Sequence, residues 1–257
     1  MLNINIKQTT EALIQSIKDY FKNNGPHANA IIGISGGKDS LVAAALCKEA
    51  LGADRVIGVM MPEFIQKDIA DSQRTVQYLG IRHLTVDIGL AVKDLYTSIK
   101  KSYNFQKDCE KIDGVVTNTP ARMRMVALYA IGAMENGRVI CTSNASEAYV
   151  GYSTKWGDGV GDFAPLRNLT TEEVCAIGIE LGLPKDLVYK TPSDGMSGLS
   201  DEDKLGFNYK DVNIILRDGN VEMIEPSAYA KINYRHNIAM HKLKPMPMFN
   251  PLLTKGD

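Results

Sequence analysis

The residues best suited to chemistry form one short stretch near the start of the chain, Ser35-Gly36-Gly37-Lys38-Asp39-Ser40. Its two glycines would let backbone N–H groups approach a ligand with no Cβ in the way. The serine hydroxyls can donate hydrogen bonds, Lys38 supplies a positive charge, and Asp39 supplies a hard oxygen ligand for Mg²⁺. This combination of residue types is suited to bind a phosphate group together with a metal ion.

The elements on either side of this stretch would position it. The apolar, β-branched run over residues 28–34 predicts a buried parallel strand, and residues 41–51 have helical composition, with Gly52 at the end of the helix. A tight turn from a strand into a helix directs N–H groups and the positive end of the helix dipole at one spot, which favours an anion. The stretch is not a Walker A loop, because Asp39 follows Lys38 where that loop requires Ser or Thr. A glycine-rich turn without a ligand is the alternative.

A second polar stretch follows a predicted strand at residues 138–142. Residues 142–147 leave the carboxyl end of that strand, where open α/β sheets bind their ligands. Residues 151–162 then carry four glycines, two aspartates, one lysine and the only tryptophan of the chain. Turn formation alone could explain this composition, but polar loops in this position more often carry function.

The order of the remaining elements predicts the fold. Helices are expected at 9–24, 66–79, 89–103 and 121–136, and further strands at 55–61 and 83–88, whereas residues 104–118 are expected to form a loop. The fourth of these helices would begin at Thr119-Pro120 and end at Gly137. Alternation of this kind predicts βαβ units and a doubly wound, mainly parallel α/β sheet with flanking helices. We expect one domain over residues 1–257, with an N-terminal helix within 1–25 and a C-terminal helical extension over 207–257.

Composition excludes several classes of protein. The net charge is −1 and charges of both signs are interspersed, so nothing predicts binding to nucleic acid or to an anionic membrane. No apolar run approaches the roughly 18 residues of a membrane span, and the N-terminus lacks the apolar core of a signal peptide, so the cytoplasm is the expected location. The four cysteines, at 47, 109, 141 and 175, form no C-x-x-C pair and predict no zinc or iron–sulfur site.

The first stretch resembles the Ser-Gly-Gly-x-Asp-Ser signature of the ATP pyrophosphatase, or PP-loop, families. Over residues 10–245 the chain is similar to the ammonia-dependent NAD⁺ synthetases of that group. The further segments that carry this likeness are Ala121-Arg122-Met123-Arg124-Met125, residues 142–147 and 151–159, Pro192-Ser193, Asp201-Glu202 with Leu205-Gly206, and His241-Lys242. The resemblance implies an adenine nucleotide alpha hydrolase-like fold and a two-step amidation. The carboxylate of deamido-NAD⁺ would attack the α-phosphorus of ATP, and ammonia would then displace AMP.

The resemblance also implies a role for individual residues. Contacts with ATP are implied for Gly33, Ser35, Gly36, Gly37, Lys38, Asp39, Ser40, Gln66, Thr142 and Ser193. Contacts with deamido-NAD⁺ are implied for Arg122, Lys155, Asp162, His241 and Lys242. Asp39 and Glu147 would hold Mg²⁺, and Asp158 would hold ammonium and accept its proton, which ammonium must lose before it can attack. Lys38, Asp39 and Asp158 would form the catalytic set.

Several of these assignments have simpler alternatives. Arg122 and Arg124 are two residues apart on a helix and point to different sides, so only one is expected to reach the site, and Arg122 is preferred. Glu147 could serve only as a helix cap, and His241-Lys242 could be a polar helix end. Two positions depart from the family pattern: Thr171 stands where many members have a lysine that contacts phosphate, and Met60 where many have an arginine. How the ATP phosphates are held is therefore left open.

The resemblance also concerns assembly and the source of nitrogen. Glutamine-dependent relatives carry an additional amidase domain, for which 257 residues leave no room, so free ammonia is the expected donor. Related enzymes are homodimers, and a homodimer is expected here. Two other functions remain as alternatives: another PP-loop reaction, such as amidation of a purine nucleotide or modification of tRNA, and nucleotide sensing without catalysis. The lack of clustered cysteines and the near-neutral charge disfavour tRNA as a substrate.

Overall fold

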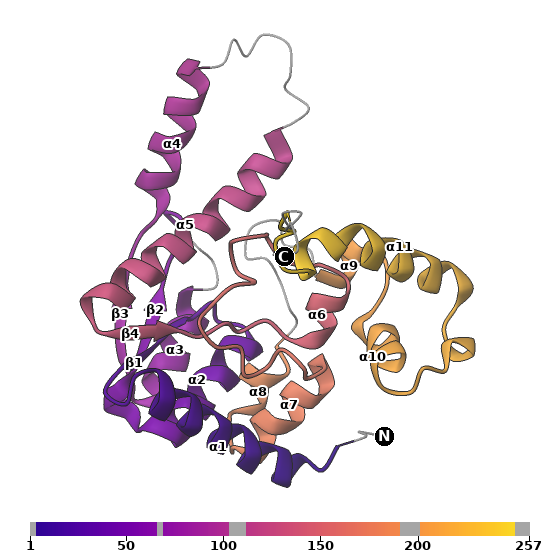
Figure 1. The fold of residues 1–257 in the computed structure, drawn as a ribbon, viewed down its shortest axis with the longest axis horizontal. Coiled ribbons are helices and arrows are strands. Elements are labelled where there is room, and N and C mark those ends of the chain that lie inside the picture. The colour runs from indigo at the N-terminus through magenta and orange to yellow at the C-terminus, as the bar shows by residue number, and fades with distance from the viewer. Residues whose placement is uncertain (1–3, 66–68, 103–111, 191–200, 250–257) are drawn as a thin grey trace, which may run out of the picture.

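A computed structural model describes residues 4–65, 69–102, 112–190 and 201–249. Its centre is a parallel sheet of β1 (Asn29–Gly33), β2 (Val56–Met60), β3 (Arg82–Thr85) and β4 (Gly137–Val139) in the order β3-β2-β1-β4 (Figure 1). The strands β1 and β2 form the middle of the sheet, and every residue of β2 is buried. The edge strand β3 is exposed. The predicted doubly wound α/β fold is confirmed.

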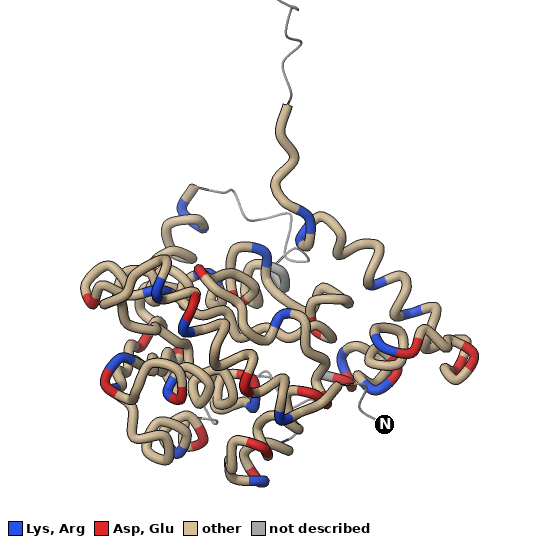
Figure 2. Tube along the Cα trace, turned by 60° about the horizontal axis from the view of Figure 1, so that its bottom comes forward, with Lys and Arg blue, Asp and Glu red and all other residues tan. Residues whose placement is uncertain are grey.

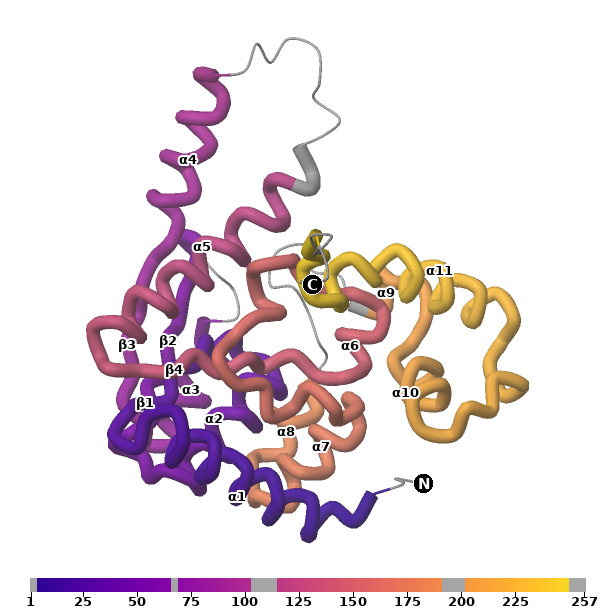
Figure 3. The backbone as a smooth tube through the Cα atoms, viewed as in Figure 1, coloured from indigo at the N-terminus to yellow at the C-terminus, as the bar shows by residue number. Residues whose placement is uncertain are grey.

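Helices cover both faces of the sheet. On one face, the main apolar core joins α1 (Ile6–Asn24), α2 (Lys38–Leu51), α3 (Ile69–Leu79), α7 (Thr171–Glu180) and α8 (Lys185–Val188). On the other face, α4 (Gly89–Ser102) and α5 (Ile112–Met134) pack over β1, β2 and β4 through a second cluster of buried residues. Figure 3 shows that α4 and the first half of α5 project beyond the edge of the sheet.

The C-terminal part of the chain adds a third cluster of buried residues. It joins α6 (Ala145–Tyr149), α9 (Asp201–Leu205), α10 (Tyr209–Arg217) and α11 (Pro226–Leu243). Short 3₁₀ turns lie at Ala53–Arg55 and Val221–Met223. Arg217 of α10 donates hydrogen bonds at 2.6 Å from Nε and Nη2 to the two carboxylate oxygens of Glu173 on α7, and Glu173 is almost fully buried. This ion pair fixes the helical extension to the sheet layer.

The start of α5 differs from the sequence prediction. Residues 112–118, expected to be part of a loop, are helical, and Pro120 lies inside the helix rather than at its first turn; residues 104–111 of the expected loop lie outside the described residues. A proline within a helix leaves the carbonyl four residues earlier without its N–H partner, which here is the carbonyl of Val116. The hydroxyl of Tyr96 on α4 donates to the carbonyls of Val115 and Val116 at 3.1 and 3.4 Å. This tertiary contact lets the helix continue through the proline.

The other end of α5 also differs. Gly137 does not end the helix but begins β4, and the left-handed backbone conformation falls on Asn136, with φ of 47°. A Cβ at position 137 would overlap the side chain of Ile31, so glycine is needed there for strand packing. The predicted strand at 138–142 is shorter than expected, and Ile140 instead forms an isolated parallel bridge with Phe163.

The surface agrees with the sequence composition. Figure 2 shows basic and acidic positions interspersed over the described chain rather than gathered by sign. No helix among the described residues is both long and apolar enough to cross a membrane.

Candidate active site

The glycine turn lies between β1 and α2, as predicted. Its backbone turns at Gly36, which has φ of 81°, and the turn is held by Ser40, whose hydroxyl donates to the Gly37 carbonyl at 3.0 Å and accepts from the Ser35 N–H at 3.3 Å. Gly37 is the N-cap of α2, and no side chain caps that end. The first N–H groups of this helix are therefore available to an anion, which the helix dipole also favours.

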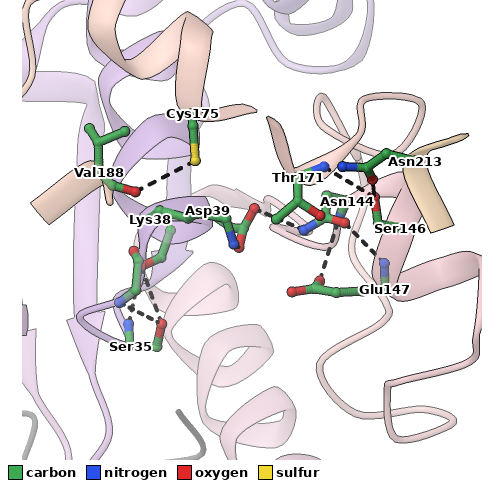
Figure 4. A network of polar contacts seen from close by, with 12 residues as sticks. Ser35, Lys38, Asp39, Asn144, Ser146, Glu147, Thr171, Cys175, Val188 and Asn213 are labelled. Carbon is green, nitrogen blue, oxygen red and sulfur yellow. Dashed lines mark hydrogen bonds and ion pairs between the residues drawn. The ribbon is translucent and has the colours of Figure 1, made fainter. Parts of the chain in front are cut away.

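A charged cluster lies at the start of α2. Lys38 is buried, and its ammonium group contacts Asp39 Oδ2 at 2.9 Å. The side chain of Asn144, just before α6, donates from Nδ2 to Asp39 Oδ1 at 3.0 Å. Asn144 Oδ1 accepts from the N–H of Glu147, and the Asn144 N–H donates back to Glu147 Oε2. Figure 4 shows Asn144 between Asp39 and Glu147.

The electrostatics of this cluster follow from burial and from its unequal charges. Burial and the nearby carboxylates of Asp39 and Asp158 raise the pKa of Glu147 to about 8, and Lys38 offsets only part of this. Burial disfavours the charged form of Lys38, but Asp39 and Glu147 outweigh it and raise the pKa of that ammonium group above its ordinary value. The two carboxylates share one lysine, so a further cation would relieve their mutual repulsion.

The chemistry of these donors fits Mg²⁺. That ion takes hard oxygen ligands, retains several waters and is often held by only one or two carboxylates together with substrate phosphates. Among the residues that the structure describes, no group of three or more His, Cys, Asp or Glu side chains forms a complete metal site. Asp39 and Glu147 next to a free helix N-terminus therefore suit a metal that arrives with a nucleotide.

The second polar stretch brings Asp158 toward this cluster. Ser143, next to Asn144, donates to the Asp158 carbonyl at 3.3 Å, and the Thr154 N–H donates to Asp158 Oδ1 at 2.8 Å. Solvent reaches Asp158, yet the surrounding protein atoms desolvate its carboxylate and raise its pKa above the ordinary value, against hydrogen bonds that lower it. Trp156 has φ of 63°, an uncommon conformation for a bulky residue.

The end of α11 fastens this stretch from the other side. Lys242 donates from Nζ to the carbonyls of Gly151 and Ser153 at 3.0 and 2.9 Å, while Lys155 donates to the carbonyl of His241 at 2.9 Å. Lys155 also lies 5.6 Å from the centre of the Trp156 ring. The structure thus brings Lys155, His241 and Lys242 together, and each lysine is bonded to main-chain oxygen.

The two arginines of α5 occupy different environments. Arg122 is exposed and donates from Nε to the carbonyl of Lys155 at 3.1 Å, which places it beside the second polar stretch. Arg124 is partly buried and donates to the carbonyl of Met61 at 3.0 Å. Their opposite directions agree with the two-residue spacing.

Asp162 lies apart from the charged cluster. Its Oδ2 accepts from the N–H of Val139 at 2.7 Å, and Tyr129 donates to its Oδ1 at 3.3 Å, so the carboxylate is tied to β4 and α5. Burial, followed by the charge of Asp162, raises the pKa of Tyr129 to about 12. A pocket of about 420 Å³ is lined here by Tyr129, Gly132, Ala133, Asn136, Gly137, Arg138 and Asp162.

The structure describes only some of the remaining predicted residues. Gln66 and Ser193 lie outside the described residues. Thr142 is half-buried at the end of the strand segment that leads to Asn144, and Gly33 ends β1 directly before the glycine turn. Of the departures from the family pattern, Met60 is buried in β2, and Thr171 begins α7 with a buried hydroxyl that has no hydrogen-bond partner among the described residues.

Asn144 is a site residue that the sequence analysis did not single out. The signal was present, because Asn144 and Glu147 form the pattern of a capping box, an Asn followed three residues later by Glu before a helix. What the pattern could not reveal is that the same amide also bonds Asp39, which lies 105 residues earlier.

Fold and site together define an α/β protein with a site suited to phosphorylated ligands at the carboxyl edge of a parallel sheet. Comparison with known proteins makes this specific: the family model described as NAD synthase matches residues 9–245. The chain therefore belongs to the NAD synthase family.

Individual relatives agree with this assignment. The NH(3)-dependent NAD(+) synthetase of Pyrococcus furiosus is 35% identical over 94% of this chain and 90% of its own length. Among solved structures, the NMN synthetase from Francisella tularensis has a TM-score of 0.86 and 33% identity, covering 96% of this chain and 100% of that one. The NH3-dependent NAD synthetase from Campylobacter jejuni has a TM-score of 0.77 and 25% identity over the same shares of the two chains.

Proposed function

We propose that this protein is an ammonia-dependent NAD⁺ synthetase, which amidates deamido-NAD⁺ with ATP and releases AMP and pyrophosphate. The observation that carries the proposal is the pairing of Asp39 and Glu147 through Asn144, beside an uncapped helix N-terminus. A carboxylate accepts an amine only after its oxygen has become a good leaving group. Attack on the α-phosphorus of ATP achieves this and leaves negative charge on pyrophosphate.

In the first step, the glycine turn would hold the phosphates that leave. The N–H groups at the start of α2, the hydroxyl of Ser35 and the ammonium of Lys38 would direct fixed donors at this developing charge, which lowers the barrier without reorganisation. The hydroxyl of Ser40, which donates to the Gly37 carbonyl, would hold the shape of the turn around the phosphates. Asp39 and Glu147 would hold Mg²⁺, which supplies Lewis-acid stabilisation of the phosphoryl oxygens when bound. Thr142, Gln66 and Ser193 complete the proposed ATP contacts.

In the second step, Asp158 would accept a proton from ammonium. Its pKa lies above the ordinary aspartate value, which makes this carboxylate a better base than an aspartate with an unshifted pKa, and its Oδ1 is held by the Thr154 N–H. The positive charges of Arg122, Lys155 and Lys242, with His241 and Asp162, would bind the nicotinate nucleotide. Lys155 and Lys242 would exchange their main-chain carbonyl partners for the ligand.

A product assay tests the proposal. Protein incubated with ATP, Mg²⁺, ammonium and deamido-NAD⁺ should yield NAD⁺, AMP and pyrophosphate in equal amounts. Formation of ADP and phosphate would contradict the proposed chemistry. ATP binding with no release of pyrophosphate would favour a nucleotide sensor instead.

A second candidate is the amidation of nicotinate mononucleotide, the acid that corresponds to NMN. This candidate is supported by the structural comparison. The TM-score is 0.86 with the Francisella tularensis NMN synthetase and 0.77 with the Campylobacter jejuni NAD synthetase. Both substrates share the reacting pyridine acid, so the catalytic residues would be the same. The ratio of kcat/KM for the mononucleotide and the dinucleotide decides between the two.

The assembly follows from the same reasoning. A single domain is supported by the Arg217–Glu173 ion pair that ties the C-terminal helices to α7. A homodimer is supported by the exposed apolar side chains of Val126, Tyr129 and Met134 on α5, and the cytoplasm is the location we propose. Light scattering after size exclusion should give twice the chain mass.

A further inference from the structure

Arg124 stands over the carboxyl ends of the two central strands. Its Nε donates to the carbonyl of Met61, the residue that follows β2, at 3.0 Å. Leu128, one helical turn further along α5, packs against the end of β1. A Cβ built at Gly33 would lie 3.4 Å from Cδ1 of Leu128. Ligands of open α/β sheets bind at this edge, so Arg124 faces the position where the reacting groups must meet.

The hydrogen bonding of Arg124 is incomplete. Within the described residues, the structure gives an acceptor to its Nε but none to its two Nη groups. The acidic side chains that act on it from around the site are Glu63 and Asp158, and neither forms a hydrogen-bonded ion pair with it. Burial dominates and lowers the pKa of the guanidinium, so a desolvated cation lies here with most of its donors unused.

We propose that Arg124 binds a phosphate group of the substrates at the reaction centre. The planar guanidinium fork matches phosphate oxygens with two parallel hydrogen bonds, which a lysine cannot do. On the same helix, Leu128 lies close to Gly33 beside the glycine turn, and Arg124 itself interacts electrostatically with Asp158 of the second polar stretch. This inference rests on the proposed function, which requires a phosphate between those two segments.

The neighbouring arginine makes the assignment specific. Arg122 points to the other side of α5, is exposed and bonds the carbonyl of Lys155. It belongs to the surroundings of the second polar stretch, whereas Arg124 faces the sheet edge. The sequence preferred Arg122 for a contact with deamido-NAD⁺, and that assignment stays a prediction; the phosphate contact proposed here belongs to Arg124 alone.

The test uses Arg124→Gln and Arg124→Lys in the full chain. Arg124→Gln retains an N–H donor for the Met61 carbonyl but removes the positive charge and the paired donors of the guanidinium. Arg124→Lys retains the positive charge but not those paired donors. Arg55→Gln is a matched control, because Arg55 also donates to a main-chain carbonyl, that of Ala28, at the opposite end of the sheet. The measurements are pyrophosphate release with ATP, Mg²⁺ and deamido-NAD⁺, calorimetric binding of ATP and of deamido-NAD⁺ separately, and Tm.

The expected result is a loss of about 10²- to 10³-fold in pyrophosphate release for Arg124→Gln, with Tm close to that of the native protein, and only partial rescue in Arg124→Lys. Weaker binding of ATP or of deamido-NAD⁺ then shows which phosphate is held. A loss of activity only in proportion to lost Tm, as expected for Arg55→Gln, would overturn the inference. If the native protein binds ATP but forms no amide, and Arg124→Gln abolishes that binding, the proposed function fails while the inference stands.

Discussion

Asn144 Nδ2 lies 3.0 Å from Asp39 Oδ1, and this one hydrogen bond joins segments that are 105 residues apart in the chain. The same side chain caps α6 at the N–H of Glu147. A single fully buried amide therefore sets the relative position of two carboxylates that come from different helices.

Replacement of Asn144 by alanine should weaken metal binding more than folding. Loss of a residue that orients metal ligands typically costs 10- to 100-fold in metal affinity, and loss of an N-cap costs about 1 kcal/mol of stability. Mn²⁺ binding followed by electron paramagnetic resonance, with ATP present, measures the first effect. Asn208→Ala is the matched control, because Asn208 caps α10 in the same way, far along the chain from the cluster. Equal metal binding in both variants would rule out that Asn144 orients the metal ligands.

The stability of the metal-free protein should fall as pH rises from about 4.5 to about 8. The folded state raises the pKa of Glu147 to about 8, so over this range the native protein holds a proton that the unfolded chain has lost. Tm measured against pH in the presence of EDTA should show this slope. Glu147→Gln should flatten it, and an unchanged slope in that variant would assign the pH dependence to other groups.

Asp158→Asn should separate the two steps of the reaction. Asparagine keeps the shape of the side chain and its hydrogen bond from the Thr154 N–H, but cannot accept a proton from ammonium. We expect pyrophosphate to appear while amide formation falls by about 10²- to 10⁴-fold. Both products are quantified in one assay; an equal fall in both would mean that the residue acts in adenylation.

Trp156 should report ligand binding directly. It is the only tryptophan of the chain, its side chain is about half exposed, and the ammonium of Lys155 lies 5.6 Å from its ring. A ligand that moves this ammonium changes the field at the indole, so titration with deamido-NAD⁺ should shift the emission. Trp156→Phe is the control without tryptophan emission. If calorimetry detects binding of deamido-NAD⁺ but the emission of the native protein does not change, the nucleotide binds away from Trp156.

Arg217→Met should destabilise the protein by about 3–5 kcal/mol, because it leaves the carboxylate of Glu173 buried and unpaired. Chemical denaturation measures the change. The double variant Glu173→Gln with Arg217→Met should recover most of the loss, since the uncompensated charge is then absent. A single variant as stable as the native chain would show that the ion pair is not what fixes α10.

Local patterns were enough to predict the sheet and the glycine turn. The apolar run before Ser35 could only be a buried strand, and the glycines after it could only begin a turn, so β1 and α2 lie where expected. The start of α5 was not predictable in this way. The carbonyl that Pro120 leaves without its N–H partner accepts from the hydroxyl of Tyr96 on another helix, a contact that no local pattern encodes.

The same limit applies to the site. Residues of the glycine turn follow from their types, but the direction of an arginine depends on what lies beneath its helix. Spacing predicted that Arg122 and Arg124 diverge; only the tertiary structure shows that Arg124 faces the carbonyl after β2. The bond between Asn144 and Asp39 likewise arises from the packing of α6 against the rest of the fold.

The ammonium of Lys242 bonds two carbonyls of the stretch that carries Asp158, and it lies in the last turn of α11. The last helix that the structure describes thus holds in place the stretch that carries Asp158. A protease cut or a shortened clone that removes residues from 242 onward would leave the sheet and its glycine turn whole while releasing the segment that carries Asp158, the proposed acceptor of the ammonium proton. Such a product should still fold around its sheet and yet be unable to carry out the proposed reaction.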